Sequence, residues 1–149
     1  MALVAKHIMI KDIICISEDS STYEAIEILV SSEANCIHVL NSEGLLVGIV
    51  TETDLVYVDK KLNASVHYAY TELDVQIDTR ALNTDLDRFK SIKIKDVMTT
   101  KLVTVKEDTP LEKIIDIIIN KGIKTIPVVR DSKVIGMISR KNILKYYLR

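Results

Sequence analysis

An internal repeat constrains the fold of this 149-residue chain more than any other feature of its sequence. At an offset of 89 residues, KHIMIKDIICISEDSSTYEAIEILV from Lys6 aligns with KDVMTTKLVTVKEDTPLEKIIDIII from Lys95. At an offset of 88, GIVTETDLV from Gly48 aligns with GMISRKNIL from Gly136. A duplicated sequence indicates two copies of one structural unit. We therefore predict repeat 1 in residues 1–55, a partly helical connecting segment in residues 56–94 and repeat 2 in residues 95–149.

Each copy has the pattern strand, helix, strand, strand, helix. The short β-rich runs at 13–16 and 102–105 predict the first strands, and turn residues at 41–44 and 130–133 predict hairpins. In repeat 2, Thr109 is the expected N-cap, with Pro110 in the first helical position and Gly122 as the stop. A unit of about 50 residues is marginal alone. We therefore predict an α/β (α+β) fold in which two β-α-β-β-α repeats pack sheet to sheet about a pseudo-twofold axis.

Charge and composition exclude several classes of partner. Residues 1–55 hold 2 lysines and 9 acidic residues (net −7), whereas residues 96–149 hold 11 basic and 6 acidic residues (net +5), so the total of −1 hides an acidic and a basic end. With no overall basic charge and 5% aromatic residues, nucleic acid is not an expected partner. No apolar run approaches the roughly 20 residues that span a bilayer, and the N-terminus does not resemble a signal peptide. We expect no membrane contact and a cytoplasmic location, with Cys15 and Cys36 as reduced thiols.

The strongest chemical signal is Gly48-Ile-Val-Thr51-Glu-Thr-Asp54, which recurs as Gly136-Met-Ile-Ser139-Arg-Lys-Asn142. A strand that ends at a hydroxyl residue and leads into a helix exposes backbone N–H groups that favour an anion. The Asp54 carboxylate can accept two hydrogen bonds from a cis-diol such as a ribose. The same residues also form a capping box, and the glycines can mark a bulge or a close sheet contact. The motif alone leaves these alternatives open.

Several weak motifs recur in order, twice, and together they identify a family. The chain carries D-V-M-T at 96–99, I-P-V-V at 126–129 and the G-x-x-T/S-x-x-D/N close of each repeat. This arrangement resembles a pair of CBS domains (cystathionine β-synthase domains). The resemblance implies a regulatory module that binds an adenosine-containing ligand, such as AMP, ADP, ATP or S-adenosylmethionine, between its repeats. It would signal occupancy to an effector protein and require no cofactor beyond this adenine nucleotide.

The resemblance also assigns the residues of one main site. It implies that Asp54 holds the ribose hydroxyls and that Thr51 lies near the ribose or phosphate. Segments of repeat 2 would hold the adenine, and residues just before the Ile-Pro dipeptide would face phosphate. The predicted site comprises Thr51, Asp54, Thr100, Lys101, Val103, Lys124, Thr125, Ile126, Pro127 and, as a further phosphate candidate, Lys141.

The second cleft departs from the family pattern and is expected to be weaker or empty. It would be formed by Ser139, Asn142, Ile14, Cys36 and His38. Asn142 stands where a ribose carboxylate is expected, and the loss of a charge-assisted acceptor costs roughly 1.5–3 kcal/mol per bond. His38 stands in place of the proline. The acidic repeat also supplies Asn35 where the basic repeat supplies Lys124, so we expect one dominant site around Asp54.

Two other functional classes are compatible with the sequence. The first is a structural module with empty clefts that acts through dimerisation, since modules of this resemblance commonly form homodimers through their helices. The second is an enzyme that uses Cys36 and His38, in which Cys36→Ala would abolish turnover. These two residues share a strand face, but neither a further metal ligand nor an orienting group has a recognisable spacing. We expect neither a catalytic nor a metal site.

Overall fold

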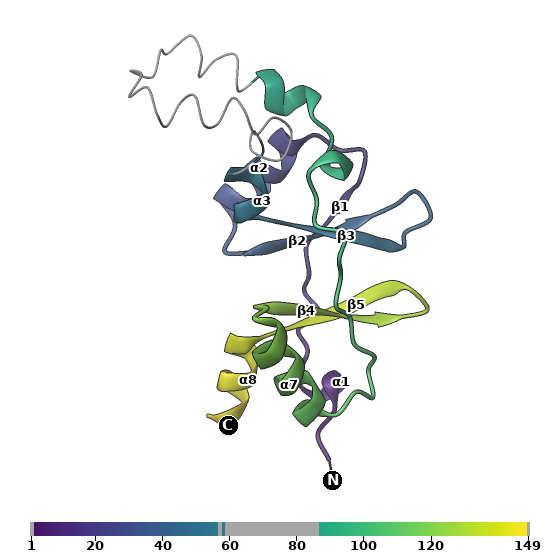
Figure 1. Ribbon diagram of the computed structural model, residues 1–149, viewed down its shortest axis with the longest axis vertical. Helices are drawn as coiled ribbons and strands as arrows, with labels where there is room; N and C mark the ends of the chain where they lie inside the picture. The colour runs from purple at the N-terminus through teal and green to yellow at the C-terminus, as the bar shows by residue number, and fades with distance from the viewer. Residues whose placement is uncertain (1, 57, 59–86, 149) are drawn as a thin grey trace.

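The structure contains two α/β repeats whose sheets face each other, with helices on the outer sides (Figure 1). It is a computed structural model that describes residues 2–56, 58 and 87–148. Repeat 1 comprises β1 (Cys15–Ser17), α2 (Thr22–Ser31), β2 (Cys36–Leu40), β3 (Leu46–Thr51) and α3 (Glu52–Val56). Repeat 2 comprises α7 (Leu111–Lys121), β4 (Thr125–Arg130), β5 (Lys133–Ser139) and α8 (Arg140–Tyr147). The predicted α+β fold with two repeats is confirmed.

The sheets differ in their first strand. In repeat 1, β1 pairs in parallel with β2, which pairs antiparallel with β3. In repeat 2, β4 and β5 form an antiparallel pair, and the strand expected at 102–105 is reduced to one bridge between Val105 and Val128. That expectation was wrong because residues 99–104 run between the repeats, so that only Val105 reaches β4, with hydrogen bonds of 3.0 Å to the Pro127 carbonyl and 2.9 Å from the Val129 amide.

Local capping explains most helix ends. Ser21 caps α2, and its side chain accepts a hydrogen bond from the Glu24 amide at 3.2 Å. Gly122 ends α7 in the left-handed conformation, with φ of 62°, as predicted. The expected N-cap of α7 was wrong by one residue: Pro110 occupies the cap, and the Thr109 hydroxyl accepts from the Lys106 amide at 3.0 Å. The hydroxyl therefore stabilises the turn before the helix rather than the helix end.

Each repeat has its own aliphatic core between sheet and helices. Ile37 and Val39 of β2 are fully buried in one core cluster, and Ile126 and Val128 of β4 are fully buried in the other. Burial of such a side chain stabilises the fold by about 1.5–3 kcal/mol. Because successive strand residues point to opposite faces, the intervening residues of β2, including His38, face the other repeat.

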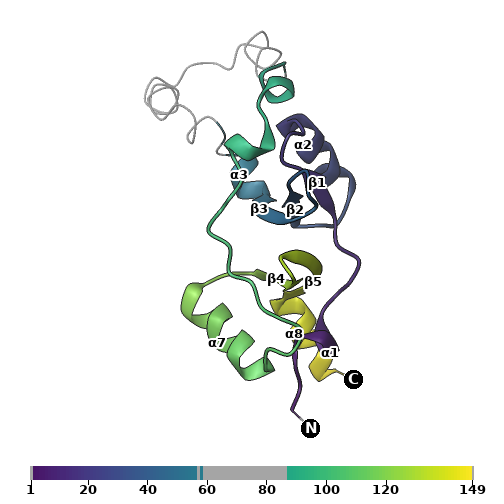
Figure 2. The same cartoon turned by 90° about the vertical axis from the view of Figure 1, so that its right-hand side faces the viewer.

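The segment that precedes each repeat packs against the other repeat. Helix α1 (Ala5–Ile8) contributes Ala5 and Ile8 to the core of repeat 2. The short 3-10 helix η1 (Ile94–Asp96) and the following Val97 contribute to the core of repeat 1. Figure 2 shows the two crossing segments on opposite sides of the facing sheets. The core of each repeat is therefore completed by the segment that precedes the other repeat in the sequence.

Backbone hydrogen bonds fix these crossings to the sheets. Ile49 and Thr99 exchange two N–H···O bonds of 3.0 and 2.9 Å, and Ile10 and Met137 exchange two of 2.9 Å. Both contacts are antiparallel bridges to the last strand of a repeat. The crossings extend each sheet by one bridge and join the two repeats.

The connecting segment is described only at its ends. Helix α3 is described from Glu52 to Val56, and Val58 is helical as well; most of the predicted partly helical segment 56–94 lies outside the described residues. Before η1, residues 87–91 are helical, and the Thr22 hydroxyl donates to the Phe89 carbonyl at 2.7 Å. This bond attaches the returning chain to α2. No helix in the described ranges is long and apolar enough to cross a membrane.

Candidate functional site between the repeats

The Thr51-x-x-Asp54 motif lies at the junction of β3 and α3. The Thr51 amide donates to Asp54 Oδ2 at 3.0 Å, and the Asp54 amide donates to Thr51 Oγ1 at 3.4 Å. These reciprocal bonds are a capping box. Asp54 is only 4% exposed, and its Oδ1 accepts a 2.9 Å hydrogen bond from the Thr99 hydroxyl. Asp54 thus joins the end of β3 to the segment that crosses from repeat 1 to repeat 2.

The Ser139-x-x-Asn142 motif has the same geometry in repeat 2. The Ser139 amide donates to Asn142 Oδ1 at 2.9 Å, and the Asn142 amide donates to Ser139 Oγ at 3.2 Å. Asn142 is 9% exposed. The capping interpretation is therefore confirmed in both repeats. An amide performs the capping role as a carboxylate does, so the charge of Asp54 is not required by the cap.

Two cavities lie between the repeats beside these motifs. The first, here called the Thr51 pocket, has a volume of about 360 Å³ and is lined by Asn35, Cys36, Ile49, Thr51, Glu52, Thr53, Ile123, Lys124 and Thr125. The second, here called the Ser139 pocket, has a volume of about 290 Å³ and is lined by Glu33, Ala34, Asn35, Cys36, Lys124, Thr125, Met137, Ser139, Arg140 and Lys141. Small-molecule sites typically occupy about 300–1,000 Å³. Both pockets take residues from both repeats, as predicted for the clefts.

The structure brings together part of the predicted main site. Thr51, Lys124 and Thr125 line the Thr51 pocket. Asp54 is buried behind Thr51, to which it is hydrogen-bonded, rather than in the wall. The remaining predicted residues, which are not part of this wall, are Thr100, Lys101, Val103, Ile126, Pro127 and Lys141.

Two of these placements have a clear physical reason. Ile126 points into the core of repeat 2, because it follows the wall residue Thr125 in the strand and takes the opposite face. Lys141 lines the Ser139 pocket instead, since it lies at the start of α8, which leaves β5 at that pocket. Lys141 is therefore positioned for the second cleft and not for the first.

The second predicted site is also only partly assembled. Ser139 and Cys36 line the Ser139 pocket, while Asn142 is buried behind Ser139. His38 is fully buried, and neither His38 nor Ile14 is in the pocket wall. Both pockets contain Cys36 because it lies on the face of β2 that meets repeat 2.

Sequence reasoning missed several wall residues. Glu52 and Thr53 line the Thr51 pocket, and Arg140 lines the Ser139 pocket. All three occupy the variable positions of the G-x-x-T/S-x-x-D/N motif, so the motif itself was the available signal. Thr99, whose hydroxyl bonds to Asp54, belongs to D-V-M-T, but its role depends on the crossing of residues 94–99 to the other repeat.

The cysteines and the buried histidine have unfavourable environments for their charged forms. Burial, with a further contribution from the Asp54 charge, raises the pKa of the Cys36 thiol to about 12. Burial also raises the pKa of Cys15 and lowers that of His38. A thiolate nucleophile needs a lowered pKa, so Cys36 is unsuited to the enzymatic alternative. Within the described residues, no three His, Cys, Asp or Glu side chains gather as a metal-binding group.

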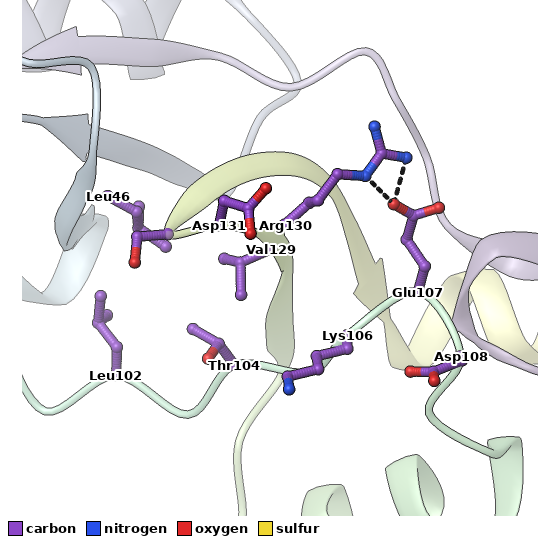
Figure 3. Close-up of a pocket in the computed structure, with 10 residues that line it drawn as sticks. Leu46, Leu102, Thr104, Lys106, Glu107, Asp108, Val129, Arg130 and Asp131 are labelled. Atoms are coloured by element: carbon purple, nitrogen blue, oxygen red, sulfur yellow. Dashed lines mark hydrogen bonds and ion pairs between the residues drawn. The ribbon is translucent and has the colours of Figure 1, made fainter.

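A larger cavity of about 700 Å³ lies at the hairpin side of the molecule (Figure 3). Its wall includes Leu46, Leu102 and Val129, together with a charged rim in which Arg130 forms an ion pair and hydrogen bond with Glu107. The Ser132 carbonyl accepts from the Leu46 amide at 3.1 Å and thereby connects the two hairpins. Neither the Thr51-x-x-Asp54 motif nor the Ser139-x-x-Asn142 motif lines this cavity. The two pockets beside those motifs are therefore the better candidates.

Known proteins of similar sequence include an inosine-5'-monophosphate dehydrogenase from Methanocaldococcus jannaschii. It is 28% identical over 95% of this chain, which spans only 23% of the dehydrogenase.

Among solved structures, the CBS domain pair of protein MJ0100, in complex with 5'-methylthioadenosine and S-adenosyl-L-methionine, is 23% identical with a TM-score of 0.70. The alignment covers 99% of this chain and 97% of that one. CBSX2 in complex with AMP is 22% identical with a TM-score of 0.73, over 97% and 96% of the chains. The family model of the CBS domain matches residues 5–61 and 94–149, and the chain therefore belongs to the CBS domain family as a tandem pair.

Proposed function

We propose that this module is regulatory and binds an adenosine-containing ligand between its two repeats. The observation that carries the proposal is the Thr51 pocket, whose wall combines β3 and α3 of repeat 1 with Ile123–Thr125 of repeat 2. Two structural neighbours are complexes with AMP or with S-adenosyl-L-methionine and 5'-methylthioadenosine, which supports this class of ligand. The raised pKa of the Cys36 thiol argues against its use as a nucleophile.

In the proposed complex each part of the ligand meets a different wall. Ile49 and Ile123 offer apolar surface to the adenine. The carboxylate of Asp54 lies behind the wall residue Thr51 and is bonded to Thr51 and Thr99. It is the proposed acceptor for the ribose hydroxyls, because a carboxylate offers about four lone-pair sites, and reaching it would require the ligand to displace the Thr51 or Thr99 contact. Contacts from Thr100, Lys101 and Val103 remain predictions that would require the crossing segment to close on the ligand. A contact from Pro127 of β4 also remains a prediction.

The proposed output follows from the position of the pocket. A ligand that contacts both repeats binds their closed arrangement more tightly than an open one, and it therefore shifts the population towards closure. Asp54 is bonded to Thr99, so ligand contact at Asp54 acts directly on the segment that joins the repeats. The change would be read by an effector protein or by a second copy of the chain.

The substitution Asp54→Asn tests the ribose assignment with little change in stability. Asn142 shows that an asparagine can cap this junction, so we expect Asp54→Asn to fold normally. Removing the charge should weaken adenosine-ligand binding about fivefold, because hydrogen bonds to charged groups contribute roughly 1 kcal/mol more than neutral ones. Isothermal titration calorimetry with S-adenosylmethionine measures the affinity, and thermal unfolding measures the stability.

Asp54→Ala provides the comparison. It removes the side-chain acceptor of the Thr51 amide as well as the charge, so it should also lose about 1 kcal/mol of stability. If Asp54→Asn bound S-adenosylmethionine as tightly as wild type, Asp54 would not hold the ribose and this assignment would be wrong.

A structural role as a homodimer is the second candidate, and the helix surfaces favour it. Val30 and Val56 are 81% and 76% exposed beside a groove between α2 and α3. Ile119 and Leu144, at the corresponding positions of α7 and α8, are 70% and 63% exposed. We propose that these faces pair in a homodimer. The −7 and +5 charges of the two ends favour contact of repeat 1 with repeat 2 of the second copy.

We expect Ile119→Asp to convert this dimer to a monomer, because an unpaired charge in an apolar interface is strongly unfavourable. Analytical ultracentrifugation measures the oligomeric state. Asn120→Asp, which adds the same charge at an exposed neighbouring position of α7, is the control and should remain dimeric. A monomeric wild-type chain, or a dimeric Ile119→Asp variant, would refute the pairing of these faces.

A further inference from the structure

The two pockets are related by the internal repeat and share their central residues. Both walls contain Asn35 and Cys36 from repeat 1 together with Lys124 and Thr125 from repeat 2. These two pairs are themselves equivalent at the offset of 89 residues. These four residues therefore form the part of the wall that the two pockets share, close to the pseudo-twofold axis.

The remaining walls correspond position by position but differ in charge. At the offset of 88, Ile49, Thr51, Glu52 and Thr53 correspond to Met137, Ser139, Arg140 and Lys141. The apolar and hydroxyl positions are matched. The next two positions change from Glu-Thr in the Thr51 pocket to Arg-Lys in the Ser139 pocket.

This exchange makes the wall of the Ser139 pocket more positively charged than that of the Thr51 pocket. The Thr51 pocket has one acidic and one basic wall residue, Glu52 and Lys124. The Ser139 pocket has three basic residues, Lys124, Arg140 and Lys141, against Glu33. Arg140 and Lys141 are exposed at the start of α8, where their side chains are available to an anion. Arginine and lysine form charge-assisted hydrogen bonds with phosphate oxygens, whereas Glu52 repels them.

We propose that the two pockets select adenosine ligands by charge: the Ser139 pocket takes a nucleotide with a polyphosphate chain, and the Thr51 pocket takes an adenosine ligand without phosphate. This proposal rests on the proposed function and specifies the ligand class of each pocket. It departs from the sequence-based expectation that one nucleotide site forms around Asp54. The reason is that Lys141, expected to serve that site, lies in the other pocket together with Arg140.

Each pocket therefore favours one part of a nucleotide and disfavours the other. In the Ser139 pocket Asn142 replaces the ribose carboxylate, but phosphate contacts to Arg140 and Lys141 compensate for the weaker ribose contact. In the Thr51 pocket Asp54 favours the ribose, while Glu52 excludes the phosphates. S-adenosylmethionine, whose sulfonium group is positively charged, suits the Thr51 pocket best.

The test is calorimetric titration of the full chain with ATP and with S-adenosylmethionine. We expect the double variant Arg140→Glu/Lys141→Glu to lose ATP affinity by about 100-fold, or roughly tenfold for each lost charge-assisted contact, while S-adenosylmethionine affinity stays within about twofold. The control Lys133→Glu/Lys145→Glu changes the net charge equally at exposed positions outside both pockets. It should bind ATP like wild type.

A gain of function provides the second arm. Glu52→Arg/Thr53→Lys gives the Thr51 pocket the residues of the Ser139 pocket, and the ATP stoichiometry should rise from one to two per chain. If wild type binds neither ligand, the proposed function itself fails. If wild type binds ATP but Arg140→Glu/Lys141→Glu leaves its affinity unchanged, the proposed function stands and the charge selection is wrong.

Discussion

A Gly136→Ala variant is expected to lose about 3 kcal/mol of stability and to unfold about 6–12 °C below wild type. The reason is that the crossing segment lies directly on β5 at this residue. A Cβ at position 136 would lie 2.8 Å from Met9 Sδ and 2.9 Å from the Ile10 carbonyl oxygen. That oxygen accepts the 2.9 Å hydrogen bond from Met137, so it cannot move away without breaking the bridge that joins the repeats. Thermal unfolding followed by circular dichroism measures the effect.

The equivalent glycine of repeat 1 supplies a matched comparison. At Gly48 the nearest atoms to a Cβ are Met98 Sδ at 2.5 Å and Cγ at 3.0 Å, and the backbone oxygen of Thr99 is farther, at 3.1 Å. A second substitution, Met98→Ala, should therefore recover part of the stability lost by Gly48→Ala. Met9→Ala should recover less in Gly136→Ala, because the backbone contact remains. Wild-type stability of Gly136→Ala would show that the crossing segment does not pack on β5.

A His38→Leu variant is expected to be more stable than wild type, by about 1–3 kcal/mol. His38 is fully buried, and neither ring nitrogen has a hydrogen-bond partner among the described residues. Burial lowers the pKa of His38; the backbone of Ile14 opposes this shift but does not reach hydrogen-bond geometry with the ring. Leucine has a similar volume and no polar atoms to leave unpaired, so it removes the cost of burying them.

The same residue makes the stability of wild type depend on pH. The pKa of His38 in the folded chain lies below the ordinary value of 6.5, so the unfolded chain binds more protons as the pH falls below 6.5. Wild-type stability should therefore decrease over that range, and the advantage of His38→Leu should grow. Urea unfolding at several pH values measures this difference. An advantage that stayed constant with pH would contradict a proton-linked cost at His38.

The repeat and the local signals predicted the fold because they depend on residues near one another in sequence. The turn residues at 41–44 and 130–133 predicted the two hairpins, and Gly122 predicted the end of α7. The two capping boxes follow from residues three positions apart. The prediction of a strand at 102–105 was wrong because this segment crosses between the repeats and only Val105 pairs with β4. A β-rich pattern carries no information about that tertiary constraint.

The sequence predicted where the candidate site lies and some of its residues, but not the full set of residues that line the pocket. Thr51, Lys124 and Thr125 were found through the family motifs and meet in one pocket. The assignment of Lys141 and the role of Thr99 depend on how the two repeats are oriented and on which core receives residues 94–99. These are relations between distant segments, so the motif spacing could not specify them.

The most direct measurement of the central claim is a calorimetric titration of the wild-type chain with AMP, ATP and S-adenosylmethionine, repeated with Asp54→Asn. The account predicts that at least one ligand binds and that the asparagine variant loses affinity for a ligand bound in the Thr51 pocket. It also predicts that a bound ligand at 100 times its dissociation constant stabilises the chain by about 2.7 kcal/mol in thermal unfolding. If none of the three ligands released heat or raised the unfolding temperature, the claim that the cleft between the repeats is an adenosine-ligand site would be contradicted.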